Sequence, residues 1–80
     1  MYGLKKYTES ISYFDKAINL DQKNAEAYNK KGITLNTLNR YNEAIICFDK
    51  AIKINPNVIA FHKNKKVALE NLFKSTRIQK

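Results

Sequence analysis

Two side chains in this sequence could take part in catalysis, and neither stands in a catalytic motif. His62 has no nucleophile or acid at a recognisable spacing, so we interpret it as a partly buried or surface residue of a helix. Cys47 lies beside Phe48 in the apolar run "AIICF", where a small hydrophobic residue is expected rather than a reactive thiol. One Cys and one His cannot supply a tetrahedral zinc site on this chain, and a single Cys excludes an internal disulfide.

The acidic residues and glycines give no stronger chemical signal. Asp15 and Asp49 occupy the same place in two copies of a repeated segment, and we interpret both as solvated. Neither Gly3 nor Gly32 has a second Gly nearby, so the sequence contains no Gly-rich phosphate-binding loop. We therefore predict a protein that is not an enzyme and that has no cofactor and no metal ion.

The composition predicts one small helical domain. Its 80 residues include only two Gly and one Pro, against five Tyr and four Phe, which suits regular helices and excludes a disordered chain. A domain of this size buries only about 60% of the surface of its unfolded chain, so every helix has to pack well. The start, "MYGLKKYTES", has no apolar stretch typical of a signal peptide, and no apolar run is long enough to span a bilayer. We expect a soluble, cytoplasmic chain that does not enter a membrane.

The strongest pattern is an internal repeat. The segments "YFDKAI" and "CFDKAI" begin at residues 13 and 47, a period of 34, and the match runs from Leu4 and Leu38 to Ile18 and Ile52. A fixed period between 20 and 50 residues indicates stacked units of secondary structure.

Each period contains two predicted helices. The first spans residues 25–38, with Asn24 as its N-cap and Asn39 in the left-handed conformation at its end. The second carries an apolar stripe from residue 44 to residue 52, and it ends before Pro56, which lacks the N–H that a continuing helix needs.

Further copies of these helices are predicted on both sides. A helix equivalent to the second one of the period is expected from about Thr8 to Leu20. A helix equivalent to the first one is expected from Val58 to Phe73. The result is four helices joined by short turns, in which consecutive helices pack antiparallel.

The complete period resembles the tetratricopeptide repeat. The match rests on small, aromatic, leucine and proline positions at the family's spacing: Tyr28, Gly32, Leu35, Ala44, Phe48, Ala51 and Pro56. Small residues let paired helices approach closely, and Phe14 and Ala17 are the equivalent packing residues in the earlier copy. Lys31 stands where the family usually has Leu, and we expect its stem to lie along apolar surface with its ammonium in water. The resemblance implies an all-α fold of antiparallel helix-turn-helix repeats stacked as a short right-handed solenoid.

We expect a single domain over residues 1–80, made of one complete repeat and two partial repeats. Residues 1–24 supply a second helix, residues 25–58 a complete repeat, and residues 59–80 a further first helix or a C-terminal capping helix with a basic tail. Lys66 stands at the position equivalent to Gly32, where a long side chain resists a following helix, as expected of an end cap. The helix that contains "YFDKAI" lacks the partner that would cover one of its faces, at Ile11, Phe14 and Ile18, which predicts a longer array or self-association.

The resemblance also implies a concave groove, lined by the first helix of each pair, for an extended peptide or a partner helix. The groove-facing residues would be Glu26, Asn29, Lys30, Ile33, Asn36 and Thr37, followed by Ala60, Lys63, Asn64, Val67, Glu70 and Asn71. Asn amides donate to and accept from a peptide backbone, and ammonium groups attract carboxylates. The first hypothesis is therefore a protein-interaction module or scaffold whose partner is a protein or peptide, acidic or carboxylate-terminated.

The second hypothesis rests on charge. The chain carries a net charge of +8, and its last quarter is rich in Lys and Arg. Such a patch attracts phosphate in a sequence-independent and salt-sensitive way, which would suit a basic nucleic-acid-associated repeat. The residues concerned are Lys63, Lys65, Lys66, Lys74 and Arg77. We favour the simpler interpretation that they make the end of the domain soluble.

Overall fold

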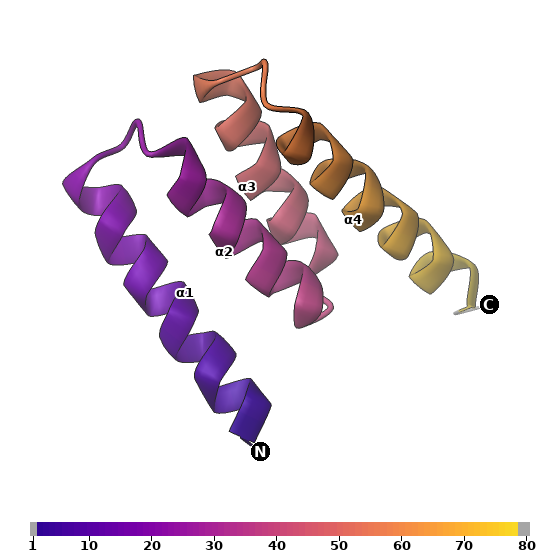
Figure 1. Ribbon diagram of the computed structural model, residues 1–80. Coiled ribbons are helices and arrows are strands. Elements are labelled where there is room, and N and C mark those ends of the chain that lie inside the picture. The colour runs from indigo at the N-terminus through magenta and orange to yellow at the C-terminus, as the bar shows by residue number, and fades with distance from the viewer. Residues whose placement is uncertain (1, 79–80) are drawn as a thin grey trace.

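Four α-helices make up the part of the chain that the structure, a computed structural model, describes: residues 2–78, with side chains over residues 5–76. They are α1 (Tyr2–Leu20), α2 (Ala25–Thr37), α3 (Tyr41–Ile54) and α4 (Ile59–Ile78). Figure 1 shows them in chain order across the molecule, with turns at alternating ends, so that neighbouring helices run antiparallel. The prediction of an all-α helical repeat is confirmed. None of the described helices combines the length and apolar character needed to cross a membrane.

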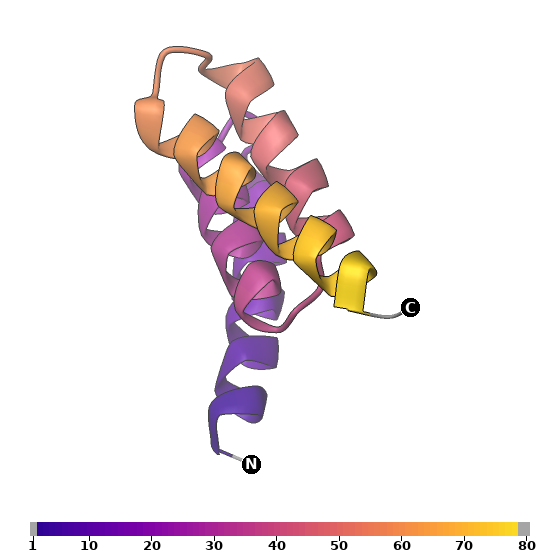
Figure 2. The same cartoon turned by 90° about the vertical axis from the view of Figure 1, so that its right-hand side faces the viewer.

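The two outer helices are longer than predicted. α1 begins at Tyr2 instead of about Thr8, and α4 continues to Ile78 instead of ending at Phe73. The Thr8 hydroxyl explains the first difference, because it donates to the Lys5 carbonyl oxygen at 2.9 Å, inside the helix, and so does not cap a helix start. Figure 2, which views the stack from the α4 side, shows the first turns of α1 extending beyond the other helices.

The turns around α2 have the predicted chemistry. The side-chain oxygen of Asn24 accepts a hydrogen bond from the Ala27 N–H at 3.0 Å, which caps the start of α2. Asn39 has φ of 65°, the left-handed conformation that reverses the chain after α2. α3 ends at Ile54, before Pro56, as the missing N–H of proline requires.

The core lies between α2 and α3 and extends to α4. It consists of Leu35, Ala44, Cys47, Phe48 and Ala68, with Ile11 of α1 and Ile45 of α3 packed against it. Gly32 lets the two helices approach, because a Cβ atom there would lie 2.5 Å from Cε1 of Phe48. Burial raises the pKa of the Cys47 thiol, which therefore behaves as the small hydrophobic residue predicted from its neighbours.

An ion pair with the same repeat spacing joins each second helix to the next first helix. Lys31 Nζ lies 2.6 Å from Asp15 Oδ1, between α2 and α1, and Lys65 Nζ lies 2.6 Å from Asp49 Oδ1, between α4 and α3. The two aspartates are half-exposed, which agrees with their interpretation as solvated, but each also pairs with a lysine, which that interpretation did not include. The Lys31 side chain is about three-quarters covered, so a lysine can replace the family's Leu because its stem packs and its ammonium meets Asp15.

The stack closes more tightly on one side than on the other. α2 contacts α4 directly, whereas no backbone contact joins α1 to α3 within the described residues. α2 and α4, which are the first helices of successive repeats, therefore form the inner side of the stack. α1 and α3, which are the second helices, form the outer side. We call the exposed surface of α2 and α4 on this side the inner face.

Candidate functional site

Two pairs of Asn side chains join α2 to α4 along the inner face. Asn64 Nδ2 donates to Asn29 Oδ1 at 2.9 Å, and Asn71 Nδ2 donates to Asn36 Oδ1 at 3.3 Å. On each helix the two Asn residues are seven positions apart, which is about two turns or ~10 Å. We call these four residues the amide seam.

The four Asn residues of the amide seam, predicted as groove residues, also have a structural role. Asn29 is only 6% exposed, and the other three are partly buried, so the seam connects two helices as well as facing outward. An Asn amide has two N–H donors and two acceptor lone pairs, and a single hydrogen bond within each pair leaves capacity for a ligand. The sequence pattern of a single helix does not indicate these partners, since each hydrogen bond joins residues in successive repeats.

An apolar pair lies between the two rungs of the seam. Ile33 is 43% exposed and Val67 is 46% exposed, and the two residues hold the same place in α2 and α4, one period apart. Each follows a residue of the first rung, Asn29 or Asn64, by about one helical turn. This brings two β-branched side chains to the surface beside groups that donate and accept hydrogen bonds.

Two lysines stand next to the first rung. Lys30 follows Asn29 in α2 and Lys63 precedes Asn64 in α4, and both lysines are exposed. Successive residues of a helix are about 100° apart around its axis. Starting from Asn29, whose side chain points to α4, both Lys30 and Ile33 lie on the same side of α2, within about a third of its circumference. The first rung is therefore the basic part of the inner face.

The second rung has different neighbours. Thr37 of α2 and Glu70 of α4 stand next to it in the sequence, and both are exposed. The Thr37 hydroxyl donates to the Ile33 carbonyl oxygen of its own helix at 3.0 Å. Glu26, one turn before Lys30, is exposed as well. A carboxylate thus lies on each side of the basic first rung along the helices, Glu26 before it and Glu70 after it.

The predicted packing residues lie mostly in the core, and those of α1 are less covered. Gly32, Leu35, Ala44, Phe48 and Ala51 are buried. Tyr28 is partly buried, with Lys50 Nζ 6.0 Å from its ring centroid. Phe14 and Ala17 are only partly buried, and Pro56 is exposed in the turn.

His62, one of the two side chains that could take part in catalysis, has a structural partner. His62 Nε2 lies 2.8 Å from the Pro56 carbonyl oxygen. Since a carbonyl oxygen only accepts, His62 Nε2 is the donor of this hydrogen bond. The imidazole thus ties the start of α4 to the preceding turn. No group of three or more His, Cys, Asp and Glu residues is placed to hold a metal ion among the residues that the structure describes.

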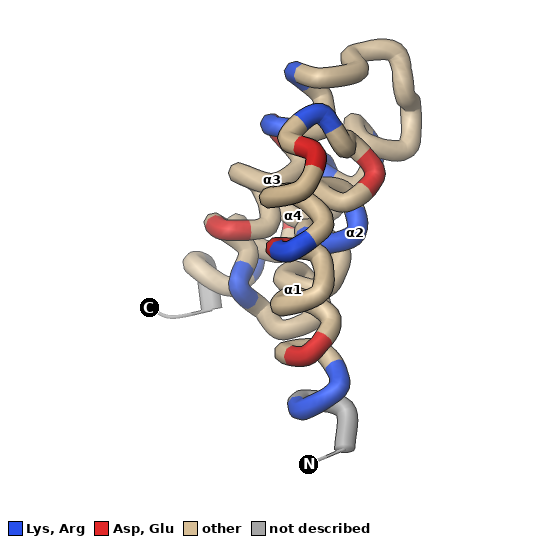
Figure 3. The backbone as a smooth tube through the Cα atoms, turned by 90° about the vertical axis from the view of Figure 1, so that its left-hand side faces the viewer, with Lys and Arg blue, Asp and Glu red and all other residues tan. Residues whose placement is uncertain are grey.

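The basic residues of the last quarter do not act as one free cluster. Lys65 is paired with Asp49, while Lys63, Lys66 and Lys74 are exposed. The Arg77 side chain lies outside the described side chains. Figure 3 shows Lys and Arg positions spread along the helices with acidic positions among them.

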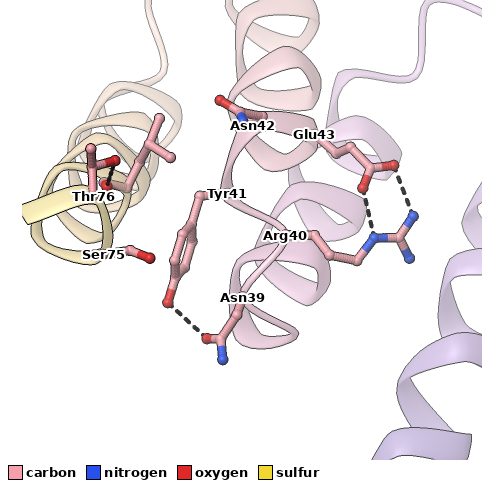
Figure 4. Close-up of a pocket in the computed structure, with 8 residues that line it drawn as sticks. Asn39, Arg40, Tyr41, Asn42, Glu43, Ser75 and Thr76 are labelled. Carbon is pink, nitrogen blue, oxygen red and sulfur yellow. Dashed lines mark hydrogen bonds and ion pairs between the residues drawn. The ribbon is translucent and has the colours of Figure 1, made fainter. Parts of the chain in front are cut away.

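A pocket that the sequence did not predict lies between the α2–α3 turn and the end of α4. Its volume is about 320 Å³, and its lining includes Asn39, Tyr41, Ser75 and Thr76. Figure 4 shows the Tyr41 ring reaching toward Asn39, and the Tyr41 hydroxyl donates to Asn39 Oδ1 at 2.7 Å.

The charged groups of this pocket pair with each other. Arg40 donates through Nε and Nη2 to the two carboxylate oxygens of Glu43, at 2.6 and 2.8 Å. The hydrogen bond and charge of Glu43 raise the pKa of Arg40, and the hydrogen bond from Arg40 lowers the pKa of Glu43. Because the pair is mutually satisfied, it offers a ligand less than the inner face does.

Comparison with known families agrees with this geometry. Two family models, both described as tetratricopeptide repeat, match residues 25–58 and residues 2–24. A comparison with curated proteins gives no significant match. The two matches adjoin at the α1–α2 turn and together cover most of the chain, and the helices pair as that repeat requires. The chain belongs to the tetratricopeptide repeat family.

Proposed function

We propose that this chain is a non-enzymatic protein-interaction module that binds a peptide segment or a partner helix across the inner face of α2 and α4. The observation that carries the proposal is the exposed pair Ile33 and Val67, set between two hydrogen-bonding rungs on adjacent helices. Membership of the family supports the proposal, since tetratricopeptide repeats generally mediate interactions between proteins and typically carry no catalytic site.

The inner face combines three kinds of contact that a peptide can use. Covering the apolar pair removes hydrocarbon from water at about 25 cal/mol per Å². The amide seam can bond to a peptide backbone whatever its side chains are, and the two lysines attract acidic ligands and speed their association.

Other exposed apolar residues lack this combination. Leu20 of α1 is 90% exposed and Ile46 of α3 is 55% exposed, but among the described residues no hydrogen-bonded pair of amides joins two helices beside them. A surface with apolar area alone can associate, yet it has little means of fixing the direction of a peptide.

Selection from a displayed library of random peptides on the immobilised chain tests the proposal. Wild-type protein should enrich peptides that the variant Ile33→Asp/Val67→Asp no longer retains, since the two carboxylates would remove the apolar contact. The matched control Ile46→Asp/Leu69→Asp changes two residues of similar exposure, 55% and 45%, on other surfaces, and it should retain the same peptides. Circular dichroism establishes that both variants fold.

Two results would contradict the proposal. One is enrichment that both double variants retain equally, because binding would then not use the inner face. The other is retention of RNA alone, abolished by nuclease and by moderate salt, which would favour the nucleic-acid hypothesis.

A further inference from the structure

We infer that the inner face selects extended segments in which an acidic residue and an aliphatic residue stand two positions apart, in either order. The acidic side chain meets Lys30 and Lys63, and the aliphatic side chain covers Ile33 and Val67. The inference rests on the proposed function and names the class of partner that this surface fits.

The spacing follows from the geometry of helix and strand. Lys30 precedes Ile33 by three residues and Lys63 precedes Val67 by four, so the basic row and the apolar row are about 5–6 Å apart along the helices. In an extended segment, residues two apart point to the same side and are about 6.6 Å apart. An acidic and an aliphatic side chain at that separation reach both rows together, whereas neighbouring residues point to opposite sides.

The charges around the basic row make its position specific. Glu26 lies one turn before Lys30, and Glu70 lies just beyond Val67, and both are exposed. A ligand carboxylate displaced by one turn toward the start of α2 meets Glu26, and one displaced the other way leaves the lysines for the apolar row and then, two turns from Lys63, meets Glu70. Repulsion from the neighbouring rows therefore selects against other spacings, as attraction selects for the matching one.

The apolar row accepts an aliphatic residue because of its own shape. Ile33 and Val67 are both β-branched, so their χ1 angles are restricted and they present a firm surface that loses little entropy on contact. The amide seam beside them is available to the backbone of the same segment. Acid, aliphatic side chain and backbone thus each have a counterpart on α2 and α4.

Fluorescence anisotropy with defined peptides tests the inference. The probes are labelled, C-terminally amidated peptides with a Gly/Ser background, which contain Glu-Leu, Glu-Ser-Leu, Glu-Ser-Ser-Leu or Gln-Ser-Leu. We expect Glu-Ser-Leu to bind about two- to fivefold more tightly than the other three, a difference typical of one exposed ion pair.

Two charge variants locate the effect. Lys30→Ala/Lys63→Ala should weaken Glu-Ser-Leu to the level of Gln-Ser-Leu while leaving Gln-Ser-Leu unchanged. The control Lys16→Ala/Lys53→Ala removes the same charge from exposed residues of α1 and α3, and should leave the preference intact.

The failures of the two proposals are distinguishable. Equal affinity for all spacings, or a preference that survives Lys30→Ala/Lys63→Ala, would overturn the inference; the proposed function would stand if Ile33→Asp/Val67→Asp still abolished binding. Peptide binding that is absent, or that is indifferent to Ile33→Asp/Val67→Asp, would overturn both.

Discussion

Gly32 determines how closely α2 and α3 approach, because the Phe48 ring lies directly against its Cα atom. Phe48 is 1% exposed, and three of its ring carbons would lie within 2.9 Å of a Cβ atom at residue 32. Any side chain at residue 32 therefore overlaps with the Phe48 ring. The free-energy cost of this overlap opposes the gain in helix propensity over glycine.

Gly32→Ala is expected to destabilise the fold by about 1–2 kcal/mol. Alanine gains about 1 kcal/mol of helix propensity over glycine, but overpacking a filled core costs about 1–3 kcal/mol, and the clash with Phe48 puts this site at the upper end. Urea denaturation measures the change. In a Phe48→Leu background the same substitution should be neutral or stabilising, and an equal loss in both backgrounds would show that Phe48 is not the cause.

Individual residues differ in how far their roles can be predicted from sequence. Gly32 and Asn24 are predictable, because a repeat pattern and a capping rule each assign one residue one local role. Lys31 is harder, since its role depends on Asp15 in another helix. The period does contain the signal: both the lysine and the aspartate recur 34 residues later, as Lys65 and Asp49.

Helices of this stack are joined by ion pairs as well as by apolar packing. The Asp15–Lys31 pair joins α1 to α2. Burial of Lys31 disfavours its charge, but the hydrogen bond and the charge of Asp15 outweigh burial and raise the pKa of Lys31. A raised pKa in the folded state means that the pair contributes stability below the unfolded lysine pKa and loses it as pH rises through the folded value.

The stabilising effect of this pair is expected to disappear at high pH. Asp15→Asn should lower the free energy of unfolding by less than about 1 kcal/mol near pH 8, since Asp15 is half-exposed. The difference between wild type and variant should shrink as pH rises above about 10.4, the ordinary lysine pKa. Urea denaturation from pH 8 to above pH 11 measures it, with Glu9→Gln, an exposed change on the same helix, as control. A difference that stays constant over this range would contradict the assignment.

The ends of the helices show the limit of prediction at the scale of the element. Thr8 is compatible with a helix start or with a helix interior, because its hydroxyl can cap free N–H groups or donate back to a carbonyl. Only the folded geometry, with the bond to the Lys5 carbonyl, decides between them. The same applies to the amide seam, whose hydrogen bonds depend on how α4 is set against α2.

The whole molecule leaves apolar surface on α1 uncovered. α1 packs against α2 and makes no backbone contact with α3 or α4 within the described residues. Tyr13 is 70% exposed and Leu20 is 90% exposed. The sequence predicts the uncovered face elsewhere, at Ile11, Phe14 and Ile18, but Ile11 packs against the core and the other two are partly buried.

Self-association through α1 is therefore expected to increase with concentration. Size-exclusion chromatography with light scattering should show a rising apparent mass for wild type, and Tyr13→Lys/Leu20→Lys should reduce it because charged side chains oppose burial of this face. Ile46→Lys/Ile59→Lys, at residues that are 55% and 72% exposed on α3 and α4, provides a control with the same added charge elsewhere. A wild-type chain that keeps the monomer mass at every concentration would exclude association through α1.

The central claim, that the inner face of α2 and α4 is the binding surface, is tested most directly by nuclear magnetic resonance. Isotope-labelled wild-type protein is titrated with a peptide selected from the library, and backbone amide shifts are followed residue by residue. Binding on the inner face should give saturable shifts that concentrate at Ile33, Asn36, Lys63 and Val67. Shifts confined to α1 and α3, or no saturable shift on α2 and α4, would contradict it.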